Sequence, residues 1–341
     1  MSSEPRNVMI THADEPIGRR LVKRLHFDES VRSILAVGSG PPPRAFDRFM
    51  RGPGRRLDYA RVDLTRHRQV NDLFHAGPLR EHGVDAVIHL PPHAQPLPGS
   101  RATLSGVPDR TTEARLILQH CLETATVRQL VALGSAYVYR LAPGNANRLT
   151  EQSELDLDPD LPPDTRSWID CDMLLHGEIH NDRLAVSLLR VPVVVGADGT
   201  LFLNPWQSGS VRSGIRAMGF DPMCALVADR DVCSALRLAV HRRVSGIFNI
   251  AGDESLPMSV LTSWSGWRSI PLPGPLLRGA AGAARMLGAD GWRTGLVGPH
   301  LRYGFTLDTS RARSELGFRP GYRIGAGRSD DGRARIETTQ I

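Results

Sequence analysis

The feature that most constrains the fold is an alternation of short apolar runs with helical patterns. Five runs have the length and composition of buried strands: residues 8–11, 34–37, 85–90, 130–133 and 186–189. An apolar stripe at helical spacing follows the first run: Ile17, Leu21, Val22 and Leu25. Residues 114–122 repeat this helical pattern before the fourth run. Because such alternation forms right-handed βαβ units, the sequence predicts an α/β fold with a Rossmann-like doubly wound parallel sheet.

The texture of the chain changes after residue 196, where Gly, Pro and Trp become frequent and periodicity weakens. We predict a Rossmann-like dinucleotide-binding domain at 7–196, to which residues 225–253 return. Within that returning segment we expect a helix at 231–242 and a strand at 246–250. A smaller C-terminal substrate lobe is predicted to comprise 197–224 and 254–323. Residues 324–341 are polar and poor in apolar side chains, so we expect a disordered tail.

Composition places the chain among globular proteins, with 41% hydrophobic and 23% charged residues. Residues 1–6 are short and polar, and no run of about 18 apolar residues occurs, so we expect neither a secretion signal nor a transmembrane segment. Four cysteines show no zinc-ligand spacing, and we expect them to be thiols in a reducing compartment. These features predict a cytoplasmic protein with no bound metal.

The formal net charge of +6 raises the question of an anionic macromolecular partner. Of the 42 basic residues only Lys23 is a lysine, an imbalance that coding bias explains as well as selection for charge. The densest arginine cluster, at 44–68, has few aromatic residues on which bases would stack. We therefore predict no nucleic-acid partner and a small-molecule or nucleotide ligand.

Six segments, in order, carry a resemblance to a known family. They are VDAVIHL (84–90), VRQLVALGSAYVY (127–139), LLRVPVVVG (188–196), VADRDVCSAL (227–236), GIFNIAG (246–252) and LDTSRARSELGFRP (307–320). Over residues 7–323 the chain resembles the NAD-dependent epimerase/dehydratase family, the extended short-chain dehydrogenases/reductases. The resemblance implies NAD or NADP as cofactor and a homodimer formed through helices. It also implies oxidoreductase, epimerase or dehydratase chemistry on a sugar nucleotide or a hydrophobic alcohol or ketone.

The family's glycine loop, TGxxGxxG, aligns with residues 11–18, and two of its three glycines are replaced. Those glycines let a diphosphate approach the first helix, where unpaired N–H groups and the macrodipole attract it. The resemblance assigns the cofactor contacts of this loop to Thr11, His12, Glu15, Ile17 and Gly18. With a histidine and a glutamate in place of glycine, we expect a weakened dinucleotide site.

Around this loop, Asp14 is a candidate N-cap and Pro16 suits the first helical position, so the helix would satisfy its own anion site. A glycine-rich turn replaces the residue that reads the cofactor ribose in the family, and Arg44 is the nearest substitute. Asp63, with Leu64 after it, matches the family's adenine-side aspartate. Asp63 would equally cap the helix that follows.

Ser135 aligns with the family's catalytic serine, although a serine at a strand end also satisfies local backbone. The family's YxxxK pair aligns with Trp168 and Asp172. In the family the ammonium lowers the pKa of the tyrosine, which then acts as acid or base. An indole only donates a hydrogen bond and has no proton that titrates in this range. An aspartate would raise the pKa of a neighbouring acid, whereas an ammonium lowers it. The resemblance thus implies a family triad position at Ser135, Trp168 and Asp172 without its standard chemistry.

Other uses of nearby side chains stay open. Tyr137 or Tyr139 would supply a displaced phenol, although core packing is the alternative for Tyr139. Asp172, His176 and His180 are four residues apart, which places them on one face of a helix, where they would bind a metal ion. Cys171 with His176 would need a cation to form a thiolate. The C-terminal part offers a further apolar surface that suits a hydrophobic ligand or a partner chain: Trp206, Trp264, Trp267, Trp292 and residues 275–288. Arg278 and Arg285 interrupt this surface on one face, which would allow contact with anionic lipid.

The leading hypothesis is a pseudoenzyme that binds a nucleotide or another small ligand without standard hydride transfer. The alternative is a divergent NAD(P)-dependent oxidoreductase, epimerase or dehydratase that uses Ser135, Asp172 and a displaced tyrosine. A third hypothesis is a scaffold that pairs with another protein.

Overall fold

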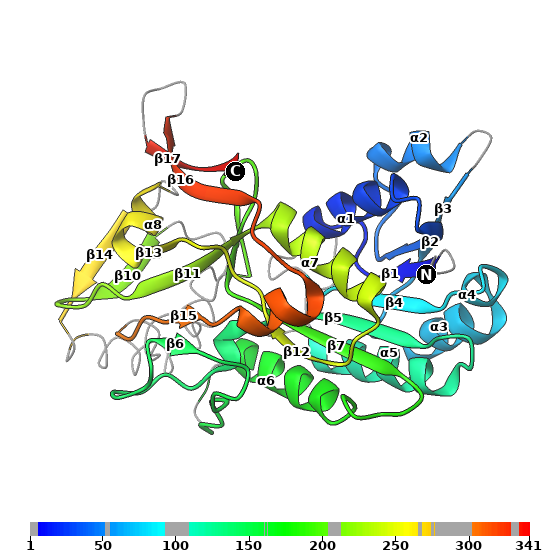
Figure 1. Cartoon of the computed structure of the whole chain (residues 1–341), viewed down its shortest axis with the longest axis horizontal. Helices are drawn as coiled ribbons and strands as arrows, with labels where there is room; N and C mark the ends of the chain where they lie inside the picture. Colours follow the sequence, from blue (N-terminus) through cyan, green and yellow to red (C-terminus); the bar gives the residue numbers. More distant parts are fainter. Residues whose placement is uncertain are drawn as a thin grey trace.

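A seven-stranded parallel sheet forms the centre of the computed structural model (Figure 1). The structure describes residues 6–51, 55–92, 109–159, 161, 163–203, 213–264, 268–273, 276, 302–328 and 334–341. The strands lie in the order β12-β7-β5-β4-β1-β2-β3. Their bounds are β1 Arg6–Ile10, β2 Val31–Gly38, β3 Leu57–Arg61, β4 Ala86–His89, β5 Gln129–Ser135, β7 Ala185–Val191 and β12 Gly246–Asn249. The order reverses between β1 and β4, which is the switch point where ligands bind in doubly wound sheets.

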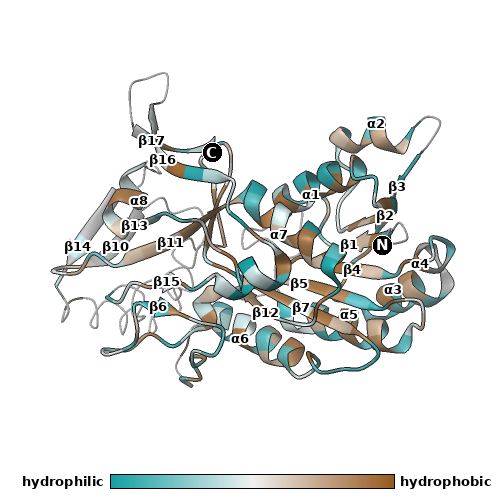
Figure 2. Ribbon diagram, viewed as in Figure 1, coloured by the Kyte–Doolittle hydropathy of each residue, from teal (hydrophilic) through white to brown (hydrophobic). Residues whose placement is uncertain are grey.

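Helices cover both faces of this sheet and bury two separate apolar cores. On one face lie α1 (Pro16–His26) and α7 (Asp229–Arg242), and on the other α3 (His67–Asn71), α5 (Arg110–Glu123) and α6 (Pro163–His176) (Figure 1). Shorter helical segments are η1 Arg44–Phe46, α2 Asp47–Met50, η2 Asp72–Ala76, α4 Pro78–Glu81 and η3 Ala136–Val138. Figure 2 shows hydrophobic residues concentrated in the strands between these layers.

Beyond β7 the chain forms smaller sheets to one side of the main sheet (Figure 1). A four-stranded sheet has the order β13-β11-β8-β9. The remaining elements are β6 Arg148–Leu149, β8 Val193–Val195, β9 Leu201–Phe202, β10 Ser213–Ala217, β11 Met223–Ala228, β13 Ser255–Pro257, α8 Met258–Trp264, β14 Arg268–Leu272, β15 Thr306–Leu307, η6 Ala312–Leu316, β16 Tyr322–Arg328 and β17 Ala334–Gln340. Side chains from β6, β8, β9, β11, β15, β16 and β17 share a third apolar core.

The predicted doubly wound parallel sheet is confirmed. The five apolar runs coincide with β1, β2, β4, β5 and β7, and the returning helix and strand are α7 and β12. Pro16 occupies the first turn of α1 as expected, and the basic side chains of its last turn complement the helix macrodipole. The division between the dinucleotide-binding domain and the substrate lobe stays a prediction.

The expectation of a disordered tail is wrong. Residues 322–328 and 334–340 pair as the antiparallel strands β16 and β17. The buried side chains of Ile324 and Ile336 anchor this hairpin in the third core. The carboxylate of Asp231, at the start of α7, accepts hydrogen bonds from the backbone N–H groups of Gly321 and Tyr322. Two apolar anchors and a buried acceptor order a segment that its polar composition would leave unfolded.

Most of the apolar surface expected in the C-terminal part lies outside the described residues. That holds for Trp206, Trp267, Trp292, Arg278, Arg285 and residues 275–288 apart from Leu276. Trp264 ends α8 and packs against the third core, which is the ordinary structural use of such a side chain.

Candidate functional site

The loop between β1 and α1 keeps a backbone conformation that favours glycine, although His12 stands at the position of the first glycine. His12 has φ 47°, in the left-handed region, and Gly18 lies so close to it that a Cβ would stand 2.3 Å from the His12 carbonyl oxygen. Thr11 ties the loop to the end of β4: its hydroxyl accepts from Leu90 N at 3.0 Å and lies 3.0 Å from His89 Nδ1. The sequence signal that survives, Thr11 with Gly18, is therefore the part needed for packing.

His12 carries a buried positive charge. Its Nε2 lies 2.8 Å from Oε2 of Glu113 on α5, and both side chains are 8% exposed. Burial by itself lowers the pKa of His12, but the charge and hydrogen bond of Glu113, with the charges of Glu15 and Asp14, together raise this pKa to about 9. Next to this charge, burial first and the His12 imidazolium second lower the pKa of His89 to about 3, so His89 is neutral. The loop thus holds an internal imidazolium and carboxylate pair.

A second carboxylate lies at the N-terminus of α1. Glu15 is the N-cap residue, and its Oε1 lies 3.9 Å from His12 Nδ1. The prediction that Asp14 is the N-cap is wrong, because its carboxylate turns away and accepts from Gly40 N at 3.1 Å. The unpaired N–H groups and the macrodipole at this end attract anions, and Glu15 already supplies one. A diphosphate that approached α1 would meet a negative side chain.

The region where the cofactor adenosine lies in the family is filled by protein groups. A Cβ at Gly38 would stand 2.3 Å from the Tyr59 hydroxyl, which donates to the Gly40 carbonyl. Arg44 is exposed in η1, beyond this turn. Asp63 accepts two hydrogen bonds from the residue two positions later, so it caps a turn before α3. Leu64 is 3% exposed and packs in the core below the sheet.

A narrow cavity of about 20 Å³ lies along the expected cofactor path, with room for roughly one water molecule. Its lining comes from α1, from the ends of β4 and β5, and from β9: Glu15, Pro16, Ile17, Leu90, Pro91, Leu133, Phe202 and Leu203. Ligand pockets measure about 300–1,000 Å³. Among the described residues, this cavity alone is too small to hold a dinucleotide.

Ser135 ends β5 and its side chain serves the local backbone. The Ser135 hydroxyl accepts from Tyr137 N at 3.2 Å and is buried, with 2% of the residue exposed. Trp168 and Asp172 lie one turn apart on α6. The Trp168 ring packs with Val138 and Ile169, and it faces the guanidinium of Arg110 at 4.5 Å from the ring centroid.

The carboxylate at the position of the family's lysine is fully paired. Arg190 on β7 donates from Nε to Asp172 Oδ2 at 2.8 Å and from Nη2 to Oδ1 at 2.6 Å, and both side chains are at most 2% exposed. Burial alone lowers the pKa of Arg190, but the hydrogen bonds and charge of Asp172 raise it on balance. Both oxygens of Asp172 are committed to this fork, so the carboxylate is held as a structural anion.

Neither nearby tyrosine supplies a poised phenol. Tyr139 is completely buried; its hydroxyl accepts from Arg190 Nη1 at 2.9 Å and donates to Asn249 Oδ1 at 2.7 Å. Burial raises the pKa of Tyr139 to about 12, against the opposing effect of Arg190. Burial also raises the pKa of Tyr137 well above its usual value, and its ring packs edge to face on Phe305. Core packing is the role the geometry gives Tyr139.

The alternative metal and thiol sites are not assembled. Asp172 is buried against Arg190, whereas His176 and His180 are exposed, and the three do not converge among the described residues. Cys171 is buried, and burial raises the pKa of its thiol to about 12, so it is protonated at neutral pH.

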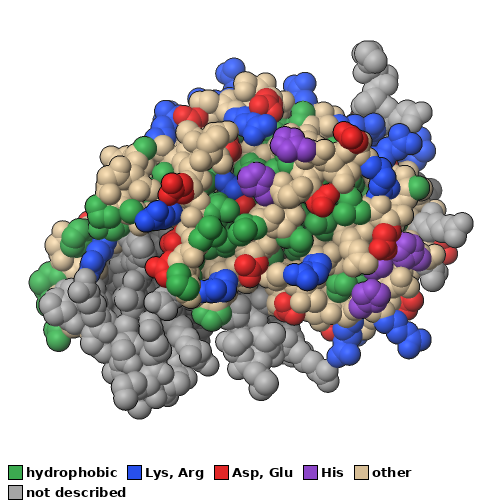
Figure 3. All heavy atoms as spheres, turned by 90° about the horizontal axis from the view of Figure 1, so that it is seen from below, with side chains coloured by type: hydrophobic (Ala, Val, Ile, Leu, Met, Phe, Trp, Pro, Cys, Tyr) green, Lys and Arg blue, Asp and Glu red, His purple; other side chains and the backbone are tan. Residues whose placement is uncertain are grey.

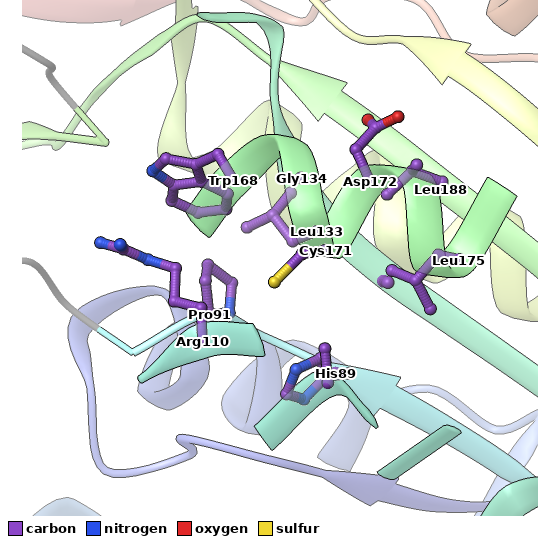
Figure 4. Close-up of a pocket in the computed structure, with 12 residues that line it drawn as sticks. His89, Pro91, Arg110, Leu133, Gly134, Trp168, Cys171, Asp172, Leu175 and Leu188 are labelled. Carbon is purple, nitrogen blue, oxygen red and sulfur yellow. The ribbon is translucent and has the colours of Figure 1, made fainter. Parts of the chain in front are cut away.

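A second cavity of about 20 Å³ lies between α5, α6 and the strand ends (Figure 4). Figure 4 shows Trp168 and Arg110 at one end of it and the Asp172 carboxylate turned away. Arg110 donates from Nη1 to Asp164 at 2.6 Å and to Ser167 at 3.0 Å, while its buried Nε has no hydrogen-bond partner within the described structure.

Three residues of this region were missed by the sequence analysis: Glu113, Arg190 and Arg110. Arg190 had a signal, because an arginine inside an apolar strand run must find a buried partner. Glu113 and Arg110 precede the helical pattern expected at 114–122 and lie in the first turn of α5, and nothing in their spacing points to His12 or Trp168.

No protein-family model matches the chain. An uncharacterized protein of Mycobacterium tuberculosis is 26% identical over 322 residues, which cover 93% of this chain and 80% of that protein. Among solved structures, dTDP-glucose 4,6-dehydratase of Bacillus anthracis in complex with NAD is 14% identical, with 93% and 92% coverage and a TM-score of 0.62. The dTDP-glucose 4,6-dehydratase DesIV of Streptomyces venezuelae, with NAD bound, is 19% identical, with 96% and 94% coverage and a TM-score of 0.63.

These similarities show the fold, which is that of the extended short-chain dehydrogenases/reductases. Across the described residues, no helix combines the length and the hydrophobicity needed to span a bilayer.

Proposed function

We propose that this chain, whose fold is that of the extended short-chain dehydrogenases/reductases, binds a nucleotide or another small ligand and does not carry out their standard hydride transfer. The observation that carries this proposal is the pair on α6: an indole at Trp168 and a carboxylate at Asp172 locked in a buried fork with Arg190. Such a protein is a pseudoenzyme of the epimerase/dehydratase fold. We place it in the cytoplasm, in keeping with its four buried, unpaired cysteines.

The chemistry of the site supports this reading. Hydride transfer to a carbonyl needs an acid whose pKa lies near the working pH, and a neighbouring cation normally tunes it. Trp168 offers only a non-titrating N–H, and the nearest described cation on α5, Arg110, packs on its ring. The guanidinium of Arg190 neutralises Asp172, so it does not lower the pKa of Tyr139 to a useful value.

The same geometry supports a ligand smaller than a dinucleotide, or one bound without a diphosphate at α1. The Glu15 carboxylate lies beside His12 at the N-terminus of α1, and Phe202 and Leu203 line the first cavity. The second cavity is lined mostly by aliphatic and aromatic side chains, which suits a small, largely apolar molecule. NAD or NADP would bind here only weakly.

Removing the charge of Glu15 should therefore strengthen dinucleotide binding. We expect Glu15→Gln to bind NAD⁺ at least about tenfold more tightly than the wild type, a gain of roughly 1.4 kcal/mol, because the carboxylate no longer opposes the diphosphate at the helix N-terminus. Isothermal titration calorimetry of both proteins with NAD⁺ measures this difference.

The matched control is Glu29→Gln, which makes the same change in net charge at an exposed residue of the turn after α1. It should leave NAD⁺ affinity unchanged. Micromolar wild-type affinity that Glu15→Gln does not improve would show that the loop accepts a diphosphate as it stands.

A divergent oxidoreductase is the second candidate, and the contact between Tyr139 and Arg190 is the observation in its favour. This function predicts that dinucleotide copurifies with the protein and that Tyr139→Phe abolishes turnover. A homodimer or a pairing with another protein stays a proposal for the helical faces.

A further inference from the structure

Two histidines and a glutamate converge on the surface at the far end of α5 from Arg110. His75 lies in the π-helical segment η2, and His120 and Glu123 lie in the last turn of α5. Figure 3 shows histidine side chains gathered at the end of the molecule occupied by α3 and α4. Single π-helical turns occur often at functional sites. This cluster is separate from the cofactor groove and from the residues of the proposed function.

The ligand atoms of the cluster form a small triangle. His75 Nε2 lies 3.1 Å from His120 Nδ1, His120 Nδ1 lies 3.4 Å from Glu123 Oε2, and His75 Nε2 lies 3.9 Å from the same oxygen. A point equidistant from all three lies about 2.0 Å from each, which matches zinc distances of about 2.0–2.2 Å to nitrogen and carboxylate oxygen. Three ligands at this spacing need almost no rearrangement to bind an ion.

Packing holds the His120 ring in place. His120 is 2% exposed, and its ring stacks on Phe74 with centroids 5.3 Å apart, which fixes the direction of Nδ1. A ligand atom that is already oriented loses little conformational freedom when it binds an ion.

The carboxylate is also held in place. Gln119, one turn earlier on α5, donates from Nε2 to Glu123 Oε1 at 2.9 Å, which leaves Oε2 directed at the histidines. Hydrogen bonds of this kind to a ligating carboxylate orient it and strengthen metal binding. The side chains of His75 and Glu123 are 40% and 49% exposed, so an ion would reach the site from solvent and keep an open fourth position.

We propose that His75, His120 and Glu123 bind one divalent transition-metal ion, with Zn²⁺ the best match to two imidazoles and a carboxylate. The ion joins η2 to the end of α5, two segments whose ligands are 45 residues apart in the sequence. The prediction of no bound metal missed this cluster, because a separation of 45 residues matches no short metal-binding motif.

Zinc titration of the full chain, after chelator treatment and buffer exchange, tests the proposal. We expect one Zn²⁺ per chain by calorimetry, and a rise in the thermal unfolding midpoint with added zinc. His75→Ala and Glu123→Gln change exposed side chains. Each should weaken zinc binding by at least about a hundredfold, which is more than the loss of a residue that only hydrogen-bonds a ligand.

His176→Ala with His180→Ala is the matched control, because it removes two exposed histidines, one at the end of α6 and one in the turn after it, and leaves the cluster intact. The control should keep wild-type affinity and stoichiometry. The proposal is wrong if the wild type shows no saturable binding at micromolar zinc. It is equally wrong if folded His75→Ala and Glu123→Gln retain wild-type affinity, or if the control loses as much affinity as they do.

Discussion

Replacing Arg190 with methionine should lower the free energy of unfolding by about 3–5 kcal/mol, because the Asp172 carboxylate then stays buried without its partner. The two side chains are at most 2% exposed, so water does not reach the orphaned charge without opening the packing between α6 and β7. Urea denaturation followed by circular dichroism gives this value.

The double variant Asp172→Leu with Arg190→Met separates a buried charge from lost packing. Replacing both partners of a buried ion pair by apolar side chains is often neutral or stabilising, so the double variant should regain most of the stability lost in the single one. A loss of less than about 1 kcal/mol in Arg190→Met, typical of an exposed pair, would contradict the buried fork.

Stability should also fall as pH rises through about 9, and His12 is the cause. Its pKa is about 9 in the folded chain and about 6.5 when unfolded, so the folded state binds the proton more tightly. The resulting stabilisation is complete below about pH 6.5 and disappears above about pH 9. A difference of about 2.5 pKa units corresponds to roughly 3 kcal/mol.

Glu113→Gln isolates this contribution, because it removes the carboxylate that holds the proton on His12. Buried thiols also disfavour alkaline pH, but they do so equally in both proteins. The difference in unfolding free energy between wild type and Glu113→Gln should be largest at about pH 6 and should disappear towards about pH 10, because the two pKa values of His12 are about 6.5 and about 9. A gap that does not change with pH would show that the pair is not an imidazolium with a carboxylate.

The parts of this molecule that follow from local pattern were predictable. The five apolar runs and the stripe with Leu21 and Leu25 fix strands and helices, because burial on a sheet demands that periodicity. The doubly wound arrangement of the sheet followed from the handedness of its crossovers, whereas the strand order was not predicted. The hairpin at 322–340 was missed, since two buried isoleucines and the carboxylate of Asp231 order it while its composition is polar.

The sequence predicted which family residues are replaced at the site, but it did not predict the contacts of the residues that replace them. Sequence alone places Trp168 and Asp172 where a tyrosine and a lysine are expected. Their partners depend on tertiary contacts: Glu113 lies 101 residues from His12, and Arg190 lies 18 residues from Asp172 on a neighbouring element. The left-handed φ of His12 was not predicted either, because glycine is the residue that indicates such a conformation in a sequence. Long-range pairing of charges cannot be read from spacing.

The most direct test of the central claim is a hydride-transfer assay with the purified full chain. NADH and NADPH are each offered with a broad panel of aldehydes, ketones and keto-sugar nucleotides, and the loss of reduced-nicotinamide absorbance is followed. We expect no oxidation above the protein-free rate. Turnover that Ser135→Ala abolishes would contradict it, because a working acid must then exist beside that serine.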